Sequence, residues 1–566
     1  MCGIWAIFGC NYDAVDLYTA ALRVSHRGPD NFRICNLSQL RNCVLAFHRL
    51  QIVGGSGGMQ PMILKQYPHL ILLCNGEIYN YKQLQEEFSF SYESGSDCEV
   101  IVHLYNKFGI KKASQLLDGV FAFLIIDTAN NSVLLSRDTF GVRPLFYDVT
   151  KNNILGVCSE VKGSLCDFKI NGHKAFQPQH LPPGHSMVCK ISEDGKVSKA
   201  APVQFHRIGK MPAHFLHQAN KLNNGYTKEA IYNNLRCLIY EAVEKRLIGQ
   251  RSLASLLSGG LDSSLISAIT VMKMRERGDK KPLQTFTIGM AESPDVTAAR
   301  EVASYIGSDH SEITFTPTEG MNALETVIYT LETYDPLTIR IAVPLYLLCG
   351  YISGNTDNVL IMTGEGADEL AQGYLYFHKQ PTAKDGDIES RRQLMQLYLY
   401  DVLRIDRCTA AHGLEIRAPF LDHAFTSYYL SLPADLRAPK NGIEKHLIRA
   451  AFEGTNLIPA NILWRQKVGF SDGVATLARP WYHFLQEDIS KQVSDECLAD
   501  ASTTYPHNTP RSKEEFYYRQ IFENKFGSHL SYLTEYQRKP NWACKYISSR
   551  LTSIPLVSHY TLSARV

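Results

Sequence analysis

The sequence predicts two domains of different class: a layered α+β domain, followed by an α/β domain with a parallel sheet and many helices. Three observations support this prediction. The chain has 566 residues, too many for one ordinary hydrophobic core. Up to about residue 200 it holds short strand-like runs and few long helices. Beyond residue 227, strands alternate with helices, which is typical of a parallel sheet.

Composition narrows the possible partners. Lys and Arg number 58 against 56 Asp and Glu, a net charge of +2, so no bulk attraction to nucleic acid or to an anionic membrane is expected. The start lacks the features of a signal peptide, and no apolar run approaches the ~18 residues of a membrane span. The 14 cysteines are scattered without a CxxC pair, which disfavours a zinc site or a disulfide framework. We therefore expect a cytoplasmic (cytosolic) protein.

In the first domain, alternating or continuous apolar runs bounded by turn residues predict the strands. The runs are 43–48, 70–75, 120–127 and 132–136. Residues 97–105 fit a short helix better. This mixture favours a layered α+β domain.

The chain opens Met1-Cys2-Gly3. If Met1 is removed, Cys2 carries a thiol and a free α-amine on one residue, a nucleophile beside a base. Their ordinary pKa values, about 8.5 and 7.7–8.0, are matched for proton transfer near neutral pH. Taken alone, a cysteine after methionine is more simply a coincidence.

Polar clusters interrupt the strands of the first domain. Arg27-Gly28-Pro29-Asp30 is one, and a second runs from Asn75 to Asn80. Each has a purely structural interpretation, since Arg-Gly-Pro-Asp suits a turn and Asn-Gly suits a tight hairpin. In isolation the turn is the better interpretation of both.

The second domain begins after a connector at 203–227 that lacks sustained periodicity. Residues 227–247 show helical spacing. Residues 255–265 then run from an apolar strand through a small-residue loop into a helix. A glycine-containing turn before a helix N-terminus makes an anion site, but the Gly-Lys-Thr/Ser ending of the Walker loop is absent. Strands are also predicted at 284–289 and 359–364.

The motifs together resemble known families. Cys-Gly-Ile from residue 2, Arg-Gly-Pro-Asp from 27 and Asn-Gly-Glu-Ile-Tyr-Asn from 75 resemble the class II (N-terminal-nucleophile) glutamine amidotransferase domain. Ser-Gly-Gly-Leu-Asp-Ser-Ser at 258–264 resembles the PP-loop of ATP pyrophosphatases. The order of these and later motifs resembles glutamine-hydrolysing asparagine synthetases over nearly the whole chain. The later motifs lie at 118–123, 137–144, 331–335, 363–370, 417–423 and 464–473.

This resemblance implies a division of the chain and a set of partners. Residues 2–202 would form the glutaminase domain, 203–227 the connector, 228–539 the PP-loop synthetase domain and 540–566 a tail. The implied substrates are L-glutamine, L-aspartate and ATP with Mg²⁺. The resemblance also suggests a homodimer. No nucleic acid and no membrane are expected as partners.

For the first site, the resemblance implies that Cys2 attacks the glutamine side-chain amide with its own α-amine as base. The Asn75 side chain and the Gly76 backbone N–H would stabilise the oxyanion. Arg49 would hold the α-carboxylate of glutamine, and Asp97 with Glu77 its α-ammonium. The remaining implied glutamine contacts are Leu50, Gln51, Ile52 and Val53.

For the second site, the resemblance implies that ATP adenylates the side-chain carboxylate of aspartate and that ammonia displaces AMP. Glu365 would take a proton from the ammonia, and Lys467 would neutralise pyrophosphate charge. Asp262 and Asp368 would contact Mg²⁺ through hard oxygen ligands. The implied ATP contacts are Leu256 and Ile288 at the adenosine, Ser258, Gly259, Gly260, Leu261, Asp262, Ser263 and Ser264 at the phosphates, and Thr363 and Gly364.

Four positions depart from the expected family pattern. Gly54 stands where an Asp is expected, in a glycine-rich loop, and glycine raises the entropy cost of ordering a lid. Leu337 replaces a Thr, Ala367 a Ser and Val468 a Glu around the second site, and each removes a polar group.

Two alternatives stay open. One is a β-lactam-synthetase-like ligase acting on another carboxylate; the complete glutaminase set argues against it, because an internal amide needs no ammonia. The other is a weakly active or non-catalytic paralogue with a regulatory or binding role, which the departures favour. Since ammonium has no lone pair for attack, the leading hypothesis also predicts an apolar channel between the two domains.

Overall fold

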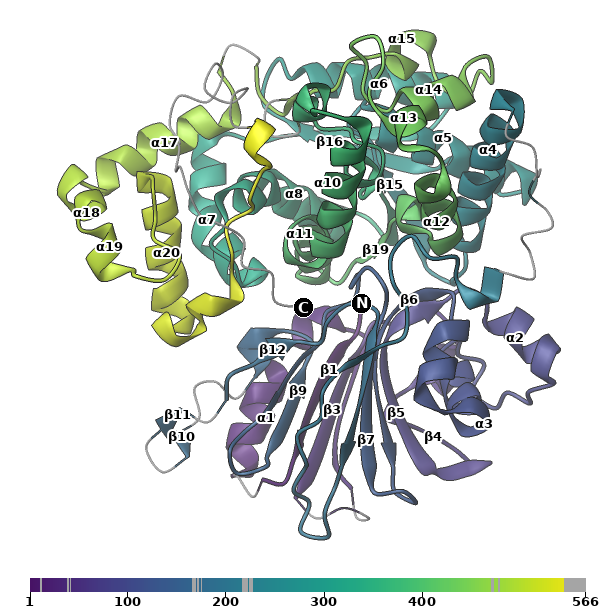
Figure 1. Cartoon of the computed structure of the whole chain (residues 1–566), viewed down its shortest axis with the longest axis vertical. Coiled ribbons are helices and arrows are strands. Elements are labelled where there is room, and N and C mark those ends of the chain that lie inside the picture. Colours follow the sequence, from purple (N-terminus) through teal and green to yellow (C-terminus); the bar gives the residue numbers. More distant parts are fainter. Residues whose placement is uncertain are drawn as a thin grey trace.

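The computed structural model describes residues 1–10, 13–37, 40, 42–164, 169–170, 173–174, 176–215, 222, 227–469, 473–476 and 479–543. The chain forms two parts, one above the other in Figure 1, and the N-terminus lies at the boundary between them. The first part contains two facing sheets, and the second a sheet surrounded by helices.

The first part is built on two six-stranded sheets, and their strands pair antiparallel. The first has the order β12-β8-β9-β1-β3-β2 and the second β14-β13-β7-β6-β5-β4. The strands of the first sheet are β1 Gly3–Phe8, β2 Asn31–Asn36, β3 Cys43–Arg49, β8 Phe146–Val149, β9 Leu155–Cys158 and β12 Gln179–His180. Those of the second are β4 Met62–Leu64, β5 Tyr67–Ile78, β6 Gly119–Asp127, β7 Ser132–Arg137, β13 His185–Lys190 and β14 Val203–Gln204. A separate pair joins β10 Lys169–Ile170 to β11 His173–Lys174.

Alternation along the strands builds the layers of this part. Every second residue of β1 (Ile4, Ala6 and Phe8) packs between the sheets with residues of β5, β6 and β7. The intervening residues Trp5 and Ile7 pack against helix α1, Ala14–Leu22. Helices α2, Tyr81–Phe88, and α3, Glu99–Leu116, cover the other sheet. The predicted layered α+β class is confirmed.

The expected elements of this part differ from the observed ones mainly at their ends. The four predicted strands lie inside β3, β5, β6 and β7, and the helix expected at 97–105 starts at Glu99 and runs to Leu116. The hairpin interpretation of Asn75-Gly76 is wrong, because both residues lie within β5, opposite Ala122 and Phe121. Gly76 suits this close pairing, since a Cβ there would meet the Val120 carbonyl oxygen at 2.3 Å.

The second part is built on a five-stranded sheet of order β17-β16-β15-β18-β19, in which all four pairings are parallel. The strands are β15 Ser252–Leu256, β16 Gln284–Gly289, β17 Asp309–Thr314, β18 Asn358–Met362 and β19 Glu415–Arg417. The longer helices around it are α4 Lys228–Lys245, α5 Leu261–Glu276, α6 Pro294–Ile306, α7 Pro317–Leu331, α8 Pro336–Asn355, α10 Ala383–Gln396, α11 Asp401–Ala410, α12 His423–Ser431, α17 Trp481–Gln492 and α20 Lys513–Phe526. Shorter helices are α9 Ala367–Leu370, α13 Ala434–Arg437, α14 His446–Phe452, α15 Ala460–Leu463, α18 Asp495–Ala499 and α19 Ala501–Thr504.

The predicted parallel sheet with many helices is therefore confirmed. Thr227 caps α4 by accepting a hydrogen bond from the Ala230 N–H, as the helical spacing from residue 227 suggests. β16 matches the predicted 284–289, whereas β18 ends at Met362 and leaves Thr363 and Gly364 in the following loop.

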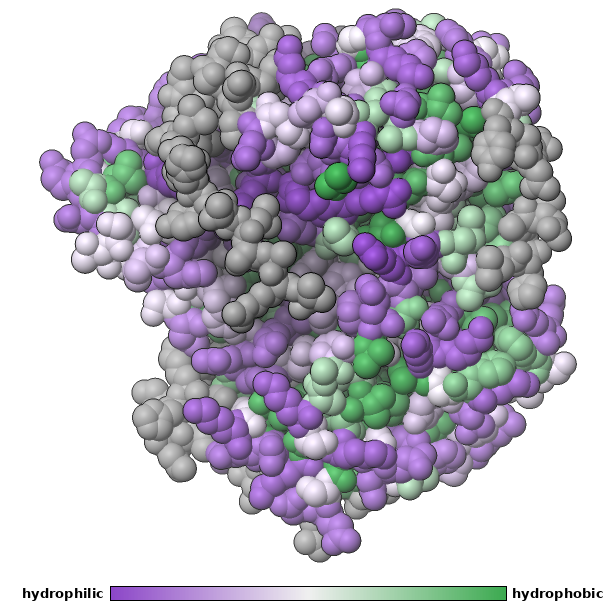
Figure 2. Space-filling view, viewed as in Figure 1, coloured by the Kyte–Doolittle hydropathy of each residue, from purple (hydrophilic) through white to green (hydrophobic). Residues whose placement is uncertain are grey.

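Helix α8 is, among the described helices, the one long and apolar enough to cross a membrane by length and composition. In the fold it is a core helix: Ile339, Val343 and Ile352 pack in one cluster with residues of α7 and α11. Its Arg340 forms a buried ion pair with Glu514. On the face drawn in Figure 2, hydrophilic residues predominate over the upper part, and hydrophobic residues gather below the boundary.

The predicted connector and tail are described only in part. The connector, 203–227, contains β14 and a short 3-10 helix at Ala213–Phe215, while 216–221 and 223–226 lie outside the described residues. In the tail, Trp542 packs against Tyr376 and Phe377 with ring centroids 5.4 and 5.9 Å apart. Residues 544–566 lie outside the described part.

Candidate active sites

Cys2 lies just before β1, where it meets β5. Its backbone N–H donates to Oδ1 of Asn75 at 2.8 Å, and its thiol lies 3.7 Å from the Leu50 carbonyl oxygen. The buried Nδ2 of Asn75 has no hydrogen-bond partner in the part of the chain that the structure describes. A buried, unpaired amide donor beside a thiol is the group that a developing oxyanion needs.

Met1 precedes Cys2 in this structure and is buried. Its amine lies 4.0 Å from Glu415 Oε2, and burial lowers the pKa of this amine to about 6. Burial also raises the pKa of the Cys2 thiol to about 11. With Met1 attached, Cys2 therefore carries a protonated thiol at neutral pH and no α-amine of its own.

The residues expected to hold free glutamine come from the ends of β3 and β5 and from the turn before α3. Arg49, the last residue of β3, donates to the Val53 carbonyl oxygen at 3.2 Å. The Ile78 N–H donates to Asp97 Oδ2 at 2.7 Å, and burial raises the pKa of Asp97 to about 6. Burial, Glu415 and Asp97 raise the pKa of Glu77 well above its usual range. Burial therefore disfavours the ionised form of both carboxyl groups.

The remaining predicted glutamine contacts form the wall toward the second part. Leu50 and Ile52 pack with Val359 and Leu360 in a small apolar cluster that Cys2 and Val53 also touch. The Gln51 N–H donates to Asp30 at 2.7 Å. Asp30 also pairs with Arg251 at 3.1 Å, so the Arg-Gly-Pro-Asp motif contacts both parts.

The structure explains why glycine stands at position 54, which the sequence did not reveal. Its φ is +82°, in the left-handed region, and a Cβ would lie 2.8 Å from Ser96 Cα. Any larger residue would strain this loop. The departure from Asp therefore fits the loop conformation.

The second candidate site is a cavity of about 1090 Å³ at the carboxyl ends of β15, β16 and β18. Such a position is where open α/β sheets bind ligands. The predicted ATP, metal and catalytic residues that line it are Leu256, Ser258, Gly260, Leu261, Asp262, Ser263, Ile288, Thr363, Gly364, Glu365, Asp368 and Lys467. Gly260 precedes α5 without a side-chain cap, so the first N–H groups of this helix remain available for an anion.

Two residues of the predicted phosphate loop lie outside the cavity lining. Gly259 has a φ of +68°, and a Cβ there would meet Ala298 Cβ at 2.5 Å, so it shapes the turn. Ser264 is fully buried, and its N–H donates to the Gly260 carbonyl oxygen at 3.1 Å within the helix. Both support the loop from behind.

A pair of lysines joins the two predicted metal-binding carboxylates. Lys445 Nζ lies 2.5 Å from Asp262 Oδ2 and 2.5 Å from Asp368 Oδ1, and Lys467 Nζ lies 2.6 Å from Asp368 Oδ2. Burial acts to raise the pKa of Asp368, but Lys445 and Lys467 hold this pKa well below its usual range. Sequence analysis did not identify Lys445; it follows Glu444 before α14, in no motif with a recognisable function.

The carboxylates fit a hard divalent cation. Asp262 Oδ1 is buried and has no hydrogen-bond partner among the residues described. Carboxylate oxygens are the ligands that Mg²⁺ prefers. The anionic charge needed to attract a cation is thus present, balanced by the two lysines.

Glu365 faces the same cavity and pairs with Arg404 of α11 at 3.1 and 3.2 Å. Burial raises the pKa of Glu365, whereas Arg404 acts to lower it. Two residues further along α11, Asp406 accepts hydrogen bonds from Arg27 of the first part at 2.9 and 3.1 Å. Arg27 Nε in turn donates to the Cys2 carbonyl oxygen at 3.0 Å. Hydrogen bonds therefore link α11 to both candidate sites, a connection that the motifs did not predict.

The departures around the second site are not equivalent. Leu337 and Val468 line the cavity, whereas Ala367 is 1% exposed at the start of α9 and is absent from the lining. Residues 470–472 of the last motif lie outside the described part of the chain.

A family model described as a glutamine amidotransferase domain matches residues 1–183, and one described as asparagine synthase matches 234–396 and 382–551. The chain is 49% identical over 566 residues to asparagine synthetase [glutamine-hydrolyzing] of Cricetulus griseus, covering 100% of both chains. It is 48% identical over 561 residues to the protein of that name from Homo sapiens, covering 99% of both. The chain belongs to the glutamine-hydrolysing asparagine synthetase family.

Membership of this family confirms the resemblance drawn from the motifs. A solved structure of the allosteric regulatory enzyme of purine biosynthesis is a more distant match. It shares 16% identity, covers 55% of this chain and 80% of that one, and has a TM-score of 0.30, too low to add to the assignment.

Proposed function

We propose that this member of the asparagine synthetase family makes L-asparagine from L-aspartate, with ATP as energy source and the amide of L-glutamine as nitrogen source. The reaction would pass through β-aspartyl-AMP and release AMP, pyrophosphate and glutamate. The observation that best supports the proposal is the presence, in one chain, of the Cys2–Asn75 pair and of the cavity above the 258–264 loop.

In the first half-reaction, removal of Met1 gives Cys2 its own α-amine. This amine takes the thiol proton, and the sulfur attacks the side-chain amide carbon of glutamine. The carbonyl oxygen becomes an oxyanion that Asn75 Nδ2 and the Gly76 N–H stabilise. The α-ammonium then returns this proton to the amide nitrogen, the C–N bond breaks, and ammonia leaves a thioester on Cys2. Water hydrolyses the thioester and frees glutamate.

In the second half-reaction, the side-chain carboxylate of aspartate displaces pyrophosphate from ATP. The N–H groups at the start of α5 hold the phosphates, and Lys467 neutralises the charge of the leaving pyrophosphate. Asp262 and Asp368 would hold Mg²⁺, which supplies positive charge to the triphosphate when bound. Ammonia then attacks the acyl carbon, Glu365 takes one of its protons and AMP leaves.

Transfer of ammonia between the sites requires a route away from bulk water, because protonation would remove its lone pair. The apolar cluster at Leu50, Ile52, Val359 and Leu360 lies beside Cys2 at the boundary between the parts. Buried charged residues, including Arg27, lie at the same boundary. An apolar channel stays a prediction, and enclosure would also supply a high effective concentration.

The proposal is tested by incubating the purified chain with glutamine labelled with ¹⁵N at its amide, aspartate, ATP and Mg²⁺. Labelled asparagine, AMP and pyrophosphate are expected in equal amounts. Unlabelled ammonium added to the medium should dilute the label only partly, and full dilution would contradict the channel. Glutamate release without asparagine would contradict the proposed function.

A weakly active or non-catalytic paralogue is the second candidate, and Leu337 and Val468 in the cavity lining favour it. A trace of asparagine, with normal glutaminase activity, would support it. The cytosolic location and the homodimer stay predictions that cell fractionation and light scattering would check.

A further inference from the structure

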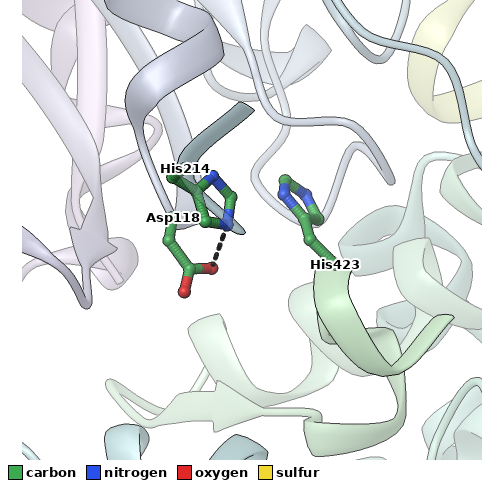
Figure 3. A group of neighbouring side chains, drawn as sticks. All are labelled: Asp118, His214 and His423. Carbon is green, nitrogen blue, oxygen red and sulfur yellow. Dashed lines mark ion pairs between the residues drawn. The ribbon is translucent and has the colours of Figure 1, made fainter. Parts of the chain in front are cut away.

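A cluster of three side chains lies where the two parts and the connector meet, apart from both candidate active sites. Asp118 precedes β6 in the first part, His214 belongs to the 3-10 helix of the connector, and His423 begins α12 of the second part. One ligand atom from each lies within 4.8 Å of the other two. Figure 3 shows the two imidazole rings facing each other, with the Asp118 carboxylate beside His214.

The imidazoles lack the partners that buried histidines usually have. Within the described residues, Nε2 of His214 and Nδ1 of His423 have no hydrogen-bond partner, although the His214 ring also interacts with the Gln115 backbone. The two residues are 9% and 8% exposed, so water does not readily replace the missing partners, and such unpaired buried groups are uncommon. Burial lowers the pKa of both histidines, which favours the neutral ring, and a neutral imidazole keeps one nitrogen lone pair for a metal ion.

Asp118 presents one oxygen to the histidines and the other to a lysine. Lys245 donates to Oδ2 at 2.6 Å, whereas Oδ1 lies 3.7 Å from His214 Nε2, beyond hydrogen-bond distance. Burial acts to raise the pKa of Asp118, but the charge of Lys245 holds it below its usual value. Lys245 is shared with Asp422 at 2.5 Å, so its charge is already balanced by a second carboxylate.

A third histidine nearby, His206, has hydrogen-bond partners for both of its ring nitrogens. His206 stacks on His423 with ring centroids 5.4 Å apart. Its Nδ1 lies 3.0 Å from the Thr139 hydroxyl, and its Nε2 lies 3.0 Å from the Lys210 carbonyl oxygen. Burial in this joint thus leaves one histidine fully paired and two with unpaired nitrogens that face a carboxylate.

We propose that Asp118, His214 and His423 bind a divalent transition metal ion of the zinc type, which fastens the two parts and the connector together. Two imidazole nitrogens and one carboxylate oxygen suit zinc better than Mg²⁺ or Ca²⁺. In a tetrahedral zinc site the ligand atoms lie about 3.4 Å apart, so the three side chains, now within 4.8 Å of one another, would move closer together on binding. Water would complete the coordination. The group contains no cysteine, so the cysteine spacing does not bear on it.

The site is tested on the full-length protein, expressed without a histidine tag, stripped with a chelator and kept in excess Mg²⁺ to occupy the carboxylates of the ATP cavity. Titration with Co²⁺ should give the visible absorption of a tetrahedral or five-coordinate ion, saturating at one equivalent, and Zn²⁺ should abolish it. One equivalent of Zn²⁺ should also raise the melting temperature.

His214→Gln and His423→Gln should each weaken Co²⁺ binding about 100-fold or more, while His206→Gln binds as the unsubstituted protein does. If a histidine variant fails to fold, Asp118→Asn provides the same comparison. Absence of the Co²⁺ absorption, or equal binding in the His206 and His214 variants, would overturn the proposal and leave an unmetallated histidine cluster.

Discussion

The two candidate active sites differ in how they are built. The Cys2 site sits on strands β1, β3 and β5, and hydrogen bonds such as Cys2 N–H to Asn75 fix its groups before any substrate arrives. The cavity of the second part is assembled from loops after three parallel strands and from distant segments, and lysine–carboxylate pairs line it. The first site is thus preorganised by the backbone, whereas in the second the charged side chains are paired with one another.

Two of the departures from the family pattern fall on the second site, because Leu337 and Val468 line the cavity. Another departure, Gly54 near the first site, is explained by the local backbone, because its φ is positive and favours glycine. The comparison therefore predicts a normal glutaminase activity in the first part and a lower synthetase activity in the second, whose cavity has lost polar side chains.

The largest expected effect separates the two sites completely. Cys2→Ala removes the nucleophile, so glutamine hydrolysis should fall by more than about 10³-fold. Ammonia-dependent asparagine synthesis should persist near its original rate, because the second cavity is untouched. Glutamate and asparagine release are measured in parallel assays, and Cys35→Ala, a half-buried thiol away from the site, is the control. Loss of both activities would contradict the division of labour.

The opposite separation is expected from the cavity. Lys467→Met removes a preorganised cation from the position of the pyrophosphate, and loss of one such group costs about 10²–10³ in rate. Asparagine formation should fall by this factor while glutamine hydrolysis stays. Lys491→Met, at a lysine whose side chain is 74% exposed, is the matched control. A fall in glutaminase activity of the same size would show that the sites are not independent.

The sequence predicts features that depend on neighbouring residues better than features that depend on the packing of distant segments. Local apolar runs predicted β3, β5, β6, β7, β16, β18 and the strand before the 258–264 loop, but not strands such as β1, β17 and β19. The motifs pointed to Cys2, Asn75 and the 258–264 loop, because each is a local run of residues. The sequence did not predict that Lys445 and Arg404 belong to the cavity, because they reach it only through the packing of α11 and of the segment before α14. The hairpin interpretation of Asn75-Gly76 failed because long strand pairing with β6 overrides the local turn preference.

A smaller effect should appear in the pH dependence of the first site. Burial raises the pKa of Asp97 to about 6, and only the ionised carboxylate attracts the α-ammonium of glutamine. Below pH 6, kcat/KM for glutamine should therefore fall about tenfold per pH unit, since this ratio reports groups of the free enzyme. Above pH 6 the ratio should no longer depend on this group. Glutamate release is followed from pH 5 to 8, and the inflection should vanish in Asp97→Asn; an unchanged inflection there would assign it to another residue.

The smallest effect tests whether the reduced polarity of the cavity matters. Leu337→Thr returns a hydroxyl to the lining, and one neutral hydrogen bond contributes about 0.5–1.5 kcal/mol, so asparagine formation should rise roughly two- to tenfold. Ala367→Ser is the matched comparison: Ala367 is buried and is absent from the cavity lining, so its rate should change less than about twofold. Both are measured with ammonia as nitrogen source, which removes the first site from the rate. A rise in Ala367→Ser alone would mean that the α9 turn, rather than the cavity surface, limits the synthetase; no rise in either would mean that this chain has adapted to an apolar lining.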